Sequence, residues 1–182
     1  MIRGDKVGLR ARHEADVPIL HAELYDDVVT RSHADSRPWR PISPGSAACP
    51  YQVGEPSDEA ACFSVIELGA VELGVDELAG EALLWGIDTH HRTAHLGISL
   101  RPAWRGRALA ADVVRLLCYY GFTVRGLRRL QVDTLASNVP MRRTAESAGF
   151  TLEGTLRRSA WVHGAHTDEV IYGLLADEWN RS

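Results

Sequence analysis

Short apolar stretches separated by polar or glycine-containing turns predict strands in the first hundred residues. They lie at residues 6–12, 62–68, 80–87 and 93–100. The polar run at residues 88–92, between the last two stretches, is typical of a hairpin connection. Because the last three strands follow one another with short connections, they predict an antiparallel meander.

A helix is predicted between the first strand and the meander. Asp16 is expected to cap it, and Pro18 suits its first turn. Apolar residues follow at helical spacing, namely Ile19, Leu20, Leu24 and Val28. Residues 31–60 are rich in Pro, Ser, Gly and Ala and predict a long surface loop, with room for a short helix. Loops of this length are usually functional or mobile, so we expect this one to face the substrate.

After residue 100 the apolar spacing becomes that of a helix, and it predicts an amphipathic helix over residues 106–124. A short helix is predicted at residues 140–148, ended by Gly149. Strands are predicted at residues 130–135, 150–156 and 169–175. This alternation, added to the meander, predicts one α/β (α+β) domain over residues 1–182, with a mixed, splayed sheet and helices on both faces.

Composition excludes several classes of protein. The chain has 182 residues, 45% apolar and 24% charged, which is typical of a soluble globular domain. The net charge of -4 gives no electrostatic reason to expect a nucleic-acid or membrane partner. No apolar run approaches the ~20 residues of a membrane span, and the first residues lack a secretory signal. We therefore expect a cytoplasmic protein. Its three cysteines suggest neither a disulfide framework nor a zinc site.

The segment with the clearest chemistry joins the strand at residues 93–100 to the helix that follows. It reads His95-Leu-Gly-Ile-Ser-Leu-Arg-Pro-Ala-Trp-Arg-Gly-Arg-Ala-Leu-Ala-Ala. The first amides of a helix have no internal partners, and the helix dipole favours an anion there. Small residues let the backbone approach a phosphate, and arginines add charge-assisted donors; these are Arg105, Gly106, Arg107, Ala108 and Ala110. The segment predicts an anion site, although a plain connection with surface arginines explains it about equally well.

Three ordered segments carry a family resemblance. Arg105-Gly-Arg-Ala-Leu-Ala resembles the Q/R-x-x-G-x-G/A pyrophosphate loop of the GNAT acyltransferases. Asn138-Val-Pro-Met-Arg-Arg-Thr-Ala-Glu-Ser-Ala-Gly-Phe resembles their N-x-x-S-x-R-x-x-E-x-x-G-F segment. Leu152-Glu-Gly-Thr-Leu-Arg and Asp168-Glu-Val-Ile-Tyr-Gly-Leu-Leu are similar to the closing strands of the RimJ/RimL-like branch. The resemblance covers residues 80–180 well and residues 1–79 only in outline.

The resemblance implies an N-acetyltransferase that moves an acetyl group from acetyl-CoA to a primary amine by direct attack. The acceptor is either a protein N-terminal α-amine or a small-molecule amine. Neither a metal nor a nucleic-acid or membrane partner is implied, and a homodimer is compatible with the family. The resemblance implies cofactor contacts from Ile98, Ser99, Leu100, Arg105, Gly106, Arg107, Ala108, Leu109, Ala110, Asn138 and Arg143. For Asn138 the alternative is helix capping, and for Arg143 a solvated helix face.

Two residues are candidates for the general base. His95 lies on the strand just before the cofactor loop, and a histidine suits proton transfer near neutral pH. Glu81 lies on the neighbouring strand. The alternatives are a solvated or packed histidine and an ordinary outward-facing carboxylate. Strand alternation places His95, Gly97 and Ser99 on one face, and Gly97 is expected to allow the bulge that splays the sheet.

Two positions depart from the family pattern. Ala108 stands where the loop has its central glycine, and Met141 stands where the second segment has serine. Met141 cannot donate a proton to the leaving thiolate. These departures keep open a non-catalytic module that binds acyl-CoA. A transferase that uses another acyl donor, such as succinyl-CoA, also stays open.

Overall fold

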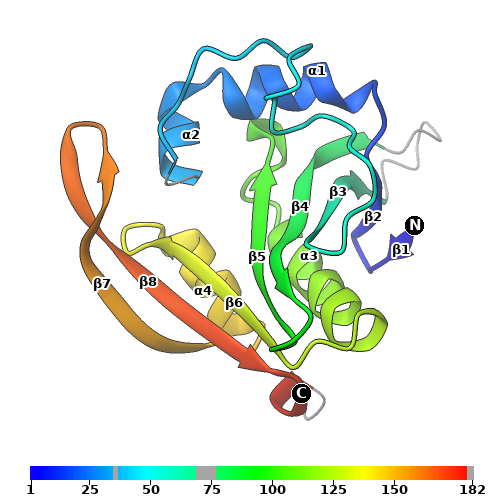
Figure 1. Ribbon diagram of the computed structural model, residues 1–182, viewed down its shortest axis with the longest axis vertical. Coiled ribbons are helices and arrows are strands. Elements are labelled where there is room, and N and C mark those ends of the chain that lie inside the picture. The colour runs from blue at the N-terminus through cyan, green and yellow to red at the C-terminus, as the bar shows by residue number, and fades with distance from the viewer. Residues whose placement is uncertain (35–36, 69–76, 180–182) are drawn as a thin grey trace.

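The computed structural model describes residues 1–34, 37–68 and 77–179, and within them one eight-stranded sheet crosses the molecule (Figure 1). The strand order is β1-β2-β3-β4-β5-β6-β8-β7. The strands are β1 (Ile2–Arg3), β2 (Val7–Ala11), β3 (Ala60–Glu67), β4 (Glu77–Asp88), β5 (Thr93–Leu100), β6 (Arg129–Leu135), β7 (Thr151–Val162) and β8 (Ala165–Leu175). The predicted meander is confirmed as β3, β4 and β5.

The sheet is mixed because β5 and β6 run parallel, whereas every other neighbouring pair is antiparallel. β5 and β6 pair only at Thr93, Ala94 and His95, and then move apart (Figure 1). β6 instead pairs with β8 along all seven of its residues. The predicted mixed and splayed sheet is confirmed.

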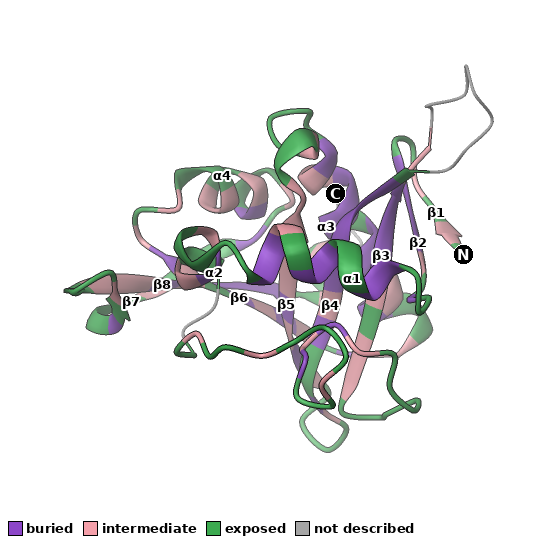
Figure 2. Cartoon of the chain, turned by 90° about the horizontal axis from the view of Figure 1, so that it is seen from above, coloured by how far each residue is buried: buried purple, intermediate pink, exposed green. Residues whose placement is uncertain are grey.

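Helical segments lie around this sheet. They are α1 (Asp16–Leu20), η1 (His21–Tyr25), α2 (Val28–Ala34), η2 (Pro102–Trp104), α3 (Leu109–Cys118), η3 (Tyr119–Val124), α4 (Val139–Ser147) and α5 (Ala176–Trp179). α3 and α4 cover one face, while the segment after α2 passes along the opposite face (Figure 2). Among the described residues no helix is long and apolar enough to cross a membrane.

Two clusters of buried side chains hold these layers together. The larger joins the sheet to α3 and α4 and includes Leu84, Leu117 and Leu130. The smaller joins α1 and η1 to the long connection before β3, and it buries Cys49 and Tyr51. Residues 31–60 are therefore more than the predicted surface loop. Part of this connection completes the core, because α1 alone leaves the apolar side chains of η1 uncovered.

The other differences lie at element ends. β1 has two residues and no pattern that could predict it. The predicted helix over residues 106–124 begins at Leu109, because Gly106 and Ala108 have positive φ. β7 and β8 extend past the predicted strands to a turn at His163 and Gly164, which both have left-handed φ. The residues of this extension are mostly exposed, so no alternation of apolar side chains marks it.

The carboxylate of Asp16 does not cap α1 as predicted. Asp16 is the first helical residue, and the N-cap, Ala15, makes no side-chain capping bond. Asp16 instead accepts hydrogen bonds from Arg10 at 2.7 and 2.9 Å, from the His13 amide at 2.9 Å and from the Ser64 hydroxyl at 2.7 Å. This buried carboxylate joins β2, α1 and β3.

The same contacts make stability depend on pH. Burial alone would raise the pKa of Asp16, but hydrogen bonds from Arg10, His13 and Ser64 outweigh burial and lower it from 3.8 to about 2. Because the folded-state pKa lies below the unfolded value, the ionised carboxylate stabilises the fold near neutral pH. That contribution is lost as pH falls toward 2.

We expect Asp16→Asn to lower the free energy of unfolding by about 2 kcal/mol at pH 7, the equivalent of the pKa shift. Urea denaturation of both proteins at pH 7, 5 and 3 measures the difference. It should narrow between pH 5 and pH 3, because the carboxyl of the unfolded wild type then becomes protonated while that of the folded protein stays mostly ionised. A difference that stays constant over this range would show that the charge has no part in stability.

Candidate active site

The chain between β5 and α3 turns through two residues with left-handed backbone. Gly106 has φ 74° and Ala108 has φ 58°. Ala108 is the N-cap of α3, and its side chain makes no capping bond. Among the described residues, none accepts a hydrogen bond from the amides of residues 106–108. These exposed donors lie at the start of a ten-residue helix, where the sequence predicts an anion site.

Arginines fix this loop and give it charge. Arg107 forms an ion pair with Glu67 at 2.5 Å, and the same carboxylate accepts the Trp104 indole at 3.1 Å. Arg101 stacks on Trp104 and donates to the Leu78 carbonyl at 2.6 Å. Arg105 uses its Nε to bond the Leu100 carbonyl at 2.9 Å, and the residue is exposed. The loop is therefore held from both sides, with the Arg105 guanidinium facing solvent.

The departure at Ala108 has a structural cost. For a residue with Cβ the left-handed conformation costs about 1–2 kcal/mol, which glycine avoids. Ala108 nevertheless adopts this left-handed conformation, with φ 58°. The residue is exposed, so its amide stays open.

The edge of β5 that faces β6 is open beyond the last shared pair. Ile98, Ser99 and Leu100 pair with β4 on one side, but they have no partner in β6 on the other. Gly97 does not cause this splay, because its pairing with Leu83 is regular. A side chain there would come within 2.9 Å of Leu83, so Gly97 makes room for that residue. The strands separate because β6 follows β8.

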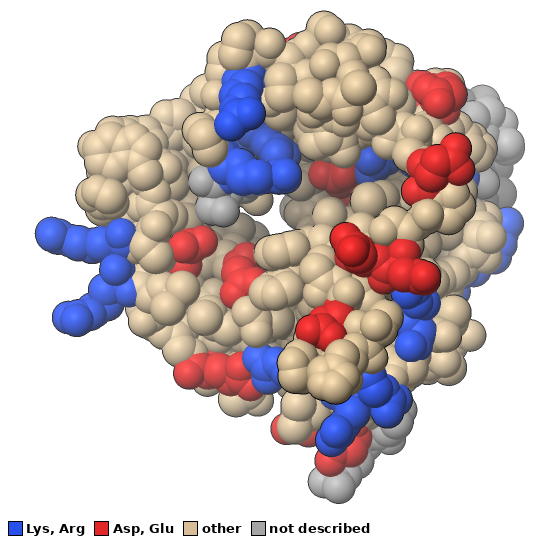
Figure 3. Space-filling model, viewed as in Figure 1, with Lys and Arg blue, Asp and Glu red and all other residues tan. Residues whose placement is uncertain are grey.

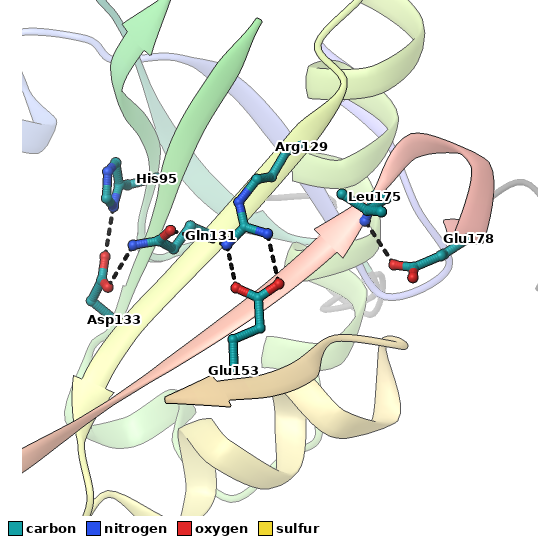
Figure 4. A network of polar contacts seen from close by, with 7 residues as sticks. All are labelled: His95, Arg129, Gln131, Asp133, Glu153, Leu175 and Glu178. Atoms are coloured by element: carbon teal, nitrogen blue, oxygen red, sulfur yellow. Dashed lines mark hydrogen bonds and ion pairs between the residues drawn. The ribbon is translucent and has the colours of Figure 1, made fainter. Parts of the chain in front are cut away.

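His95 lies at the apex of this opening, in the last pair shared by β5 and β6. Its Nδ1 is 2.6 Å from Oδ2 of Asp133 (Figure 4). Its ring stacks on Trp85 with centroids 4.2 Å apart. About a third of the side chain, 32%, is exposed. Burial would raise the pKa of Asp133, but hydrogen bonds from His95 and Gln131 outweigh burial and lower it. His95 is thus a partly exposed imidazole beside an ionised carboxylate.

Sequence reasoning missed Asp133. Its signal is the alternation of β6, which puts Gln131 and Asp133 on the same face as each other. That signal identifies a partner for His95 only once β5 and β6 are known to be parallel neighbours with this register.

Glu81, the second candidate base, is buried, so the alternative of an ordinary outward-facing carboxylate is wrong. Its Oε2 accepts a hydrogen bond from Arg12 at 2.8 Å, and the Arg12 guanidinium lies 5.6 Å from the Tyr51 ring centroid. Glu81 is paired across the sheet with Ser99, four residues from His95 and so about 13 Å away along the strand. The two candidate bases therefore lie at different points along the opening.

The second predicted cofactor segment forms α4. Asn138 caps this helix, because its Oδ1 accepts the Met141 amide at 3.2 Å while its Nδ2 donates to Thr134 at 3.1 Å. Arg143 is exposed and has no ion pair with a described residue, whereas Arg142 bonds the Ala136 carbonyl and the Tyr172 hydroxyl. Met141 packs partly buried against the larger cluster. Cofactor contacts from Asn138 and Arg143 stay predictions.

A hollow lies in the face opposite α3, with basic atoms along its upper edge and acidic atoms below it (Figure 3). On this side a cavity of about 230 Å³ is lined by Tyr25, Arg31, Arg37, Pro38, Arg40, Ile42, Ala48 and Pro50. The Pro50 carbonyl lies 3.5 Å from Arg12, the partner of Glu81. The cavity therefore adjoins the polar face of β4. Among the described residues no three His, Cys, Asp or Glu side chains gather as a metal site.

Comparison with known families fits this geometry. The family described as "Acetyltransferase (GNAT) domain" matches residues 6–151. The chain belongs to this family. Its resemblance to the RimJ/RimL-like branch is also confirmed, since the GNAT relatives include the "Ribosomal-protein-serine acetyltransferase" of Escherichia coli, 26% identical over 102 residues, 56% of this chain and 57% of that protein.

Other GNAT relatives differ in their acceptors. The "Putative ribosomal N-acetyltransferase YdaF" of Bacillus subtilis is 30% identical over 116 residues, 62% of this chain and 63% of that protein. The "Spermidine N(1)-acetyltransferase" of Escherichia coli is 30% identical over 94 residues, 52% of this chain and 50% of that protein. The matched stretch thus spans between half and two thirds of each relative.

The solved structures establish the fold. A crystal structure of spermidine N-acetyltransferase from Vibrio cholerae, in complex with CoA and spermine, superposes with a TM-score of 0.83 at 21% sequence identity. The comparison covers 96% of this chain and 98% of that one. The predicted GNAT fold is therefore confirmed over almost the whole chain.

Proposed function

We propose that this GNAT protein transfers an acetyl group from acetyl-CoA to a primary amine. The observation that carries the proposal is the uncapped start of α3, placed directly after a β5 edge that has lost its β6 partner. An anion site and an open strand edge in series match a cofactor that has phosphates followed by an amide-containing arm. The solved relative in complex with CoA and spermine supports this use of the fold.

The cofactor's pyrophosphate would lie against the amides of residues 106–110, with Arg105 and Arg107 adding charge. The arm would run beside Ile98, Ser99 and Leu100 and hydrogen-bond their free backbone groups as an added strand does. The opening ends where β5 and β6 meet, so the thioester would stop close to His95.

The reaction proposed is direct attack. The neutral amine forms the new N–C bond at the thioester carbonyl, and the C–S bond breaks to release the thiolate. A backbone amide of residues 98–100 stabilises the oxyanion. His95 takes the amine proton, because it is partly exposed at the apex, whereas Glu81 is held in a buried ion pair with Arg12. Solvent protonates the thiolate, since Met141 has no proton to give.

The acceptor we propose is a peptide or protein α-amine. The relatives include enzymes named for ribosomal proteins and for spermidine, so sequence similarity alone is compatible with either acceptor. Here three arginines, Arg31, Arg37 and Arg40, line the cavity on the acceptor side. Like charges repel a polycation such as spermidine. An α-amine also needs less base assistance, because its pKa is near 8 rather than near 10.4.

The first prediction compares two glycines in the same backbone state. Gly106 and Gly164 have φ 74° and 82°, and at neither would a Cβ meet an atom within 4 Å. Valine causes similar strain at both, but only residue 106 belongs to the anion site. We expect Gly106→Val to weaken acetyl-CoA binding about tenfold or more, the equivalent of one lost phosphate hydrogen bond. Calorimetry measures the affinity; equal affinities for Gly106→Val and Gly164→Val would contradict the cofactor site.

The second prediction concerns the acceptor. An uncharged tetrapeptide with a free N-terminus should have a kcat/KM about tenfold or more above that of spermidine, because of the repulsion by arginines. CoA release followed with a thiol reagent measures both, and the N-acetylated tetrapeptide is the control. Faster turnover of spermidine would refute the α-amine assignment.

The same assay separates the alternative functions. Acetyl-CoA binding without CoA release on any amine would favour a non-catalytic module, and faster CoA release from succinyl-CoA than from acetyl-CoA would favour another donor.

The third prediction concerns His95. His95→Ala should lower kcat by about 100- to 10,000-fold, the usual contribution of a general base, and leave acetyl-CoA affinity nearly unchanged. His91→Ala, in the exposed turn before β5, is the matched control. A loss of less than about threefold in His95→Ala would give the role to Glu81 or to solvent.

A further inference from the structure

His95 ends a chain of side-chain hydrogen bonds that joins residues of β7, β6 and β5 and passes over β8 (Figure 4). Glu153 on β7 binds both terminal nitrogens of Arg129 on β6, at 2.7 and 2.5 Å. Arg129 Nη2 donates to Gln131 Oε1 at 3.1 Å, and Gln131 Nε2 donates to Asp133 Oδ1 at 2.8 Å. The other oxygen of Asp133 lies 2.6 Å from His95 Nδ1.

The chemistry of these groups allows only one direction of donation along the chain. A guanidinium has donors and no acceptor, so Gln131 must turn its oxygen to Arg129 and its NH2 to Asp133. An ionised carboxylate only accepts hydrogen bonds, so Asp133 must accept one from the Nδ1–H of His95. The neutral imidazole therefore carries its proton on Nδ1 and leaves Nε2 with a lone pair.

We propose that Asp133 is a positioning residue which, held by Gln131 and Arg129, fixes His95 in the Nδ1–H form with Nε2 ready to accept a proton. This inference rests on the proposed function, in which the acceptor amine loses one proton as its N–C bond forms. That proton moves to Nε2, and the resulting imidazolium returns it to solvent. Asp133 itself stays ionised throughout and touches neither substrate.

Two further contacts support a positioning role. The Trp85 ring lies stacked on His95 with an interplanar angle of 20°, so the ring plane is fixed as well as its hydrogen bond. Hydrogen bonds from Arg129 lower the pKa of Glu153, and the anchor of the chain stays charged. Partly exposed ion pairs contribute little to stability, so this arrangement adds little to folding.

Asp133→Asn tests the inference sharply because Gln131 controls the new amide. Gln131 Nε2 still requires an acceptor, so the asparagine keeps its oxygen at the Oδ1 position. Its NH2 then faces His95 Nδ1 and donates to it. The ring is driven to the Nε2–H form, and the nitrogen needed as base is blocked. In Gln131→Leu/Asp133→Asn the amide is free to turn, so the Nδ1–H form can return.

The ring form is read from the two ¹⁵N signals of His95, identified by their loss in His95→Gln. We expect Nδ1–H in the wild type and Nε2–H in Asp133→Asn. The kcat of Asp133→Asn should fall by about 100-fold, the low end of a general base's contribution, with KM for acetyl-CoA unchanged. The double variant should recover part of that loss. Gln131→Leu alone keeps the Asp133 carboxylate as the acceptor of Nδ1–H, so it should lose less kcat than Asp133→Asn.

An Nε2–H ring in the wild type would overturn the inference. So would an unchanged ring form in Asp133→Asn, or a double variant no faster than Asp133→Asn. Asp88→Asn is the matched control, because the Asp88 carboxylate accepts hydrogen bonds from the turn amides of His90 and His91 and lies outside this chain of hydrogen bonds. If the wild type released no CoA on any amine, the proposed function would fail, and the ring form would still decide this inference.

Discussion

β6 lies beside β5 for only three residues before it leaves to follow β8, and the candidate site depends on this separation. The seven antiparallel pairs with β8 outnumber the three parallel pairs with β5. β6 therefore takes the direction of β8, and the sheet opens along the upper half of β5 (Figure 1). The pairing of β5 with β4 is regular from His95 to Leu100, and the register shift of this pair lies between Trp85 and Asp88.

Along the opening, backbone groups of β5 have no hydrogen-bonding partners in β6. Such groups need partners, because an unpaired amide or carbonyl away from water is costly. At the upper end of the same strand, the start of α3 leaves further amides without acceptors. The unpaired backbone groups of β5 are followed directly by the unpaired amides at the start of α3, and the proposed cofactor would hydrogen-bond with both sets. The proposed binding site thus follows from hydrogen bonds that the fold does not make internally.

The two faces of β5 divide the work between stability and chemistry. Leu96 lies on the face that packs beneath α3, in the larger cluster. His95 lies on the other face, where Trp85 and Asp133 hold it in one orientation. The buried pair of Arg12 and Glu81 lies farther along this polar face, beside Tyr51. Carboxylates near the opening thus serve different purposes, and the contacts of each one decide its role.

The sequence by itself determined the strands of the meander, the helix after the loop and the family, and it predicts the anion site at residues 105–110. Each of these follows from local rules, since apolar spacing, helix-start chemistry and a short motif involve neighbours in the chain. The tertiary structure alone decided that Asp16 and Glu81 are buried in ion pairs, that Cys49 and Tyr51 complete a core, and that Asp133 holds His95. Those outcomes join residues as much as 69 positions apart, as in the pair of Arg12 and Glu81. They depend on which strands become neighbours and in which register, and the spacing of residues along the chain determines neither.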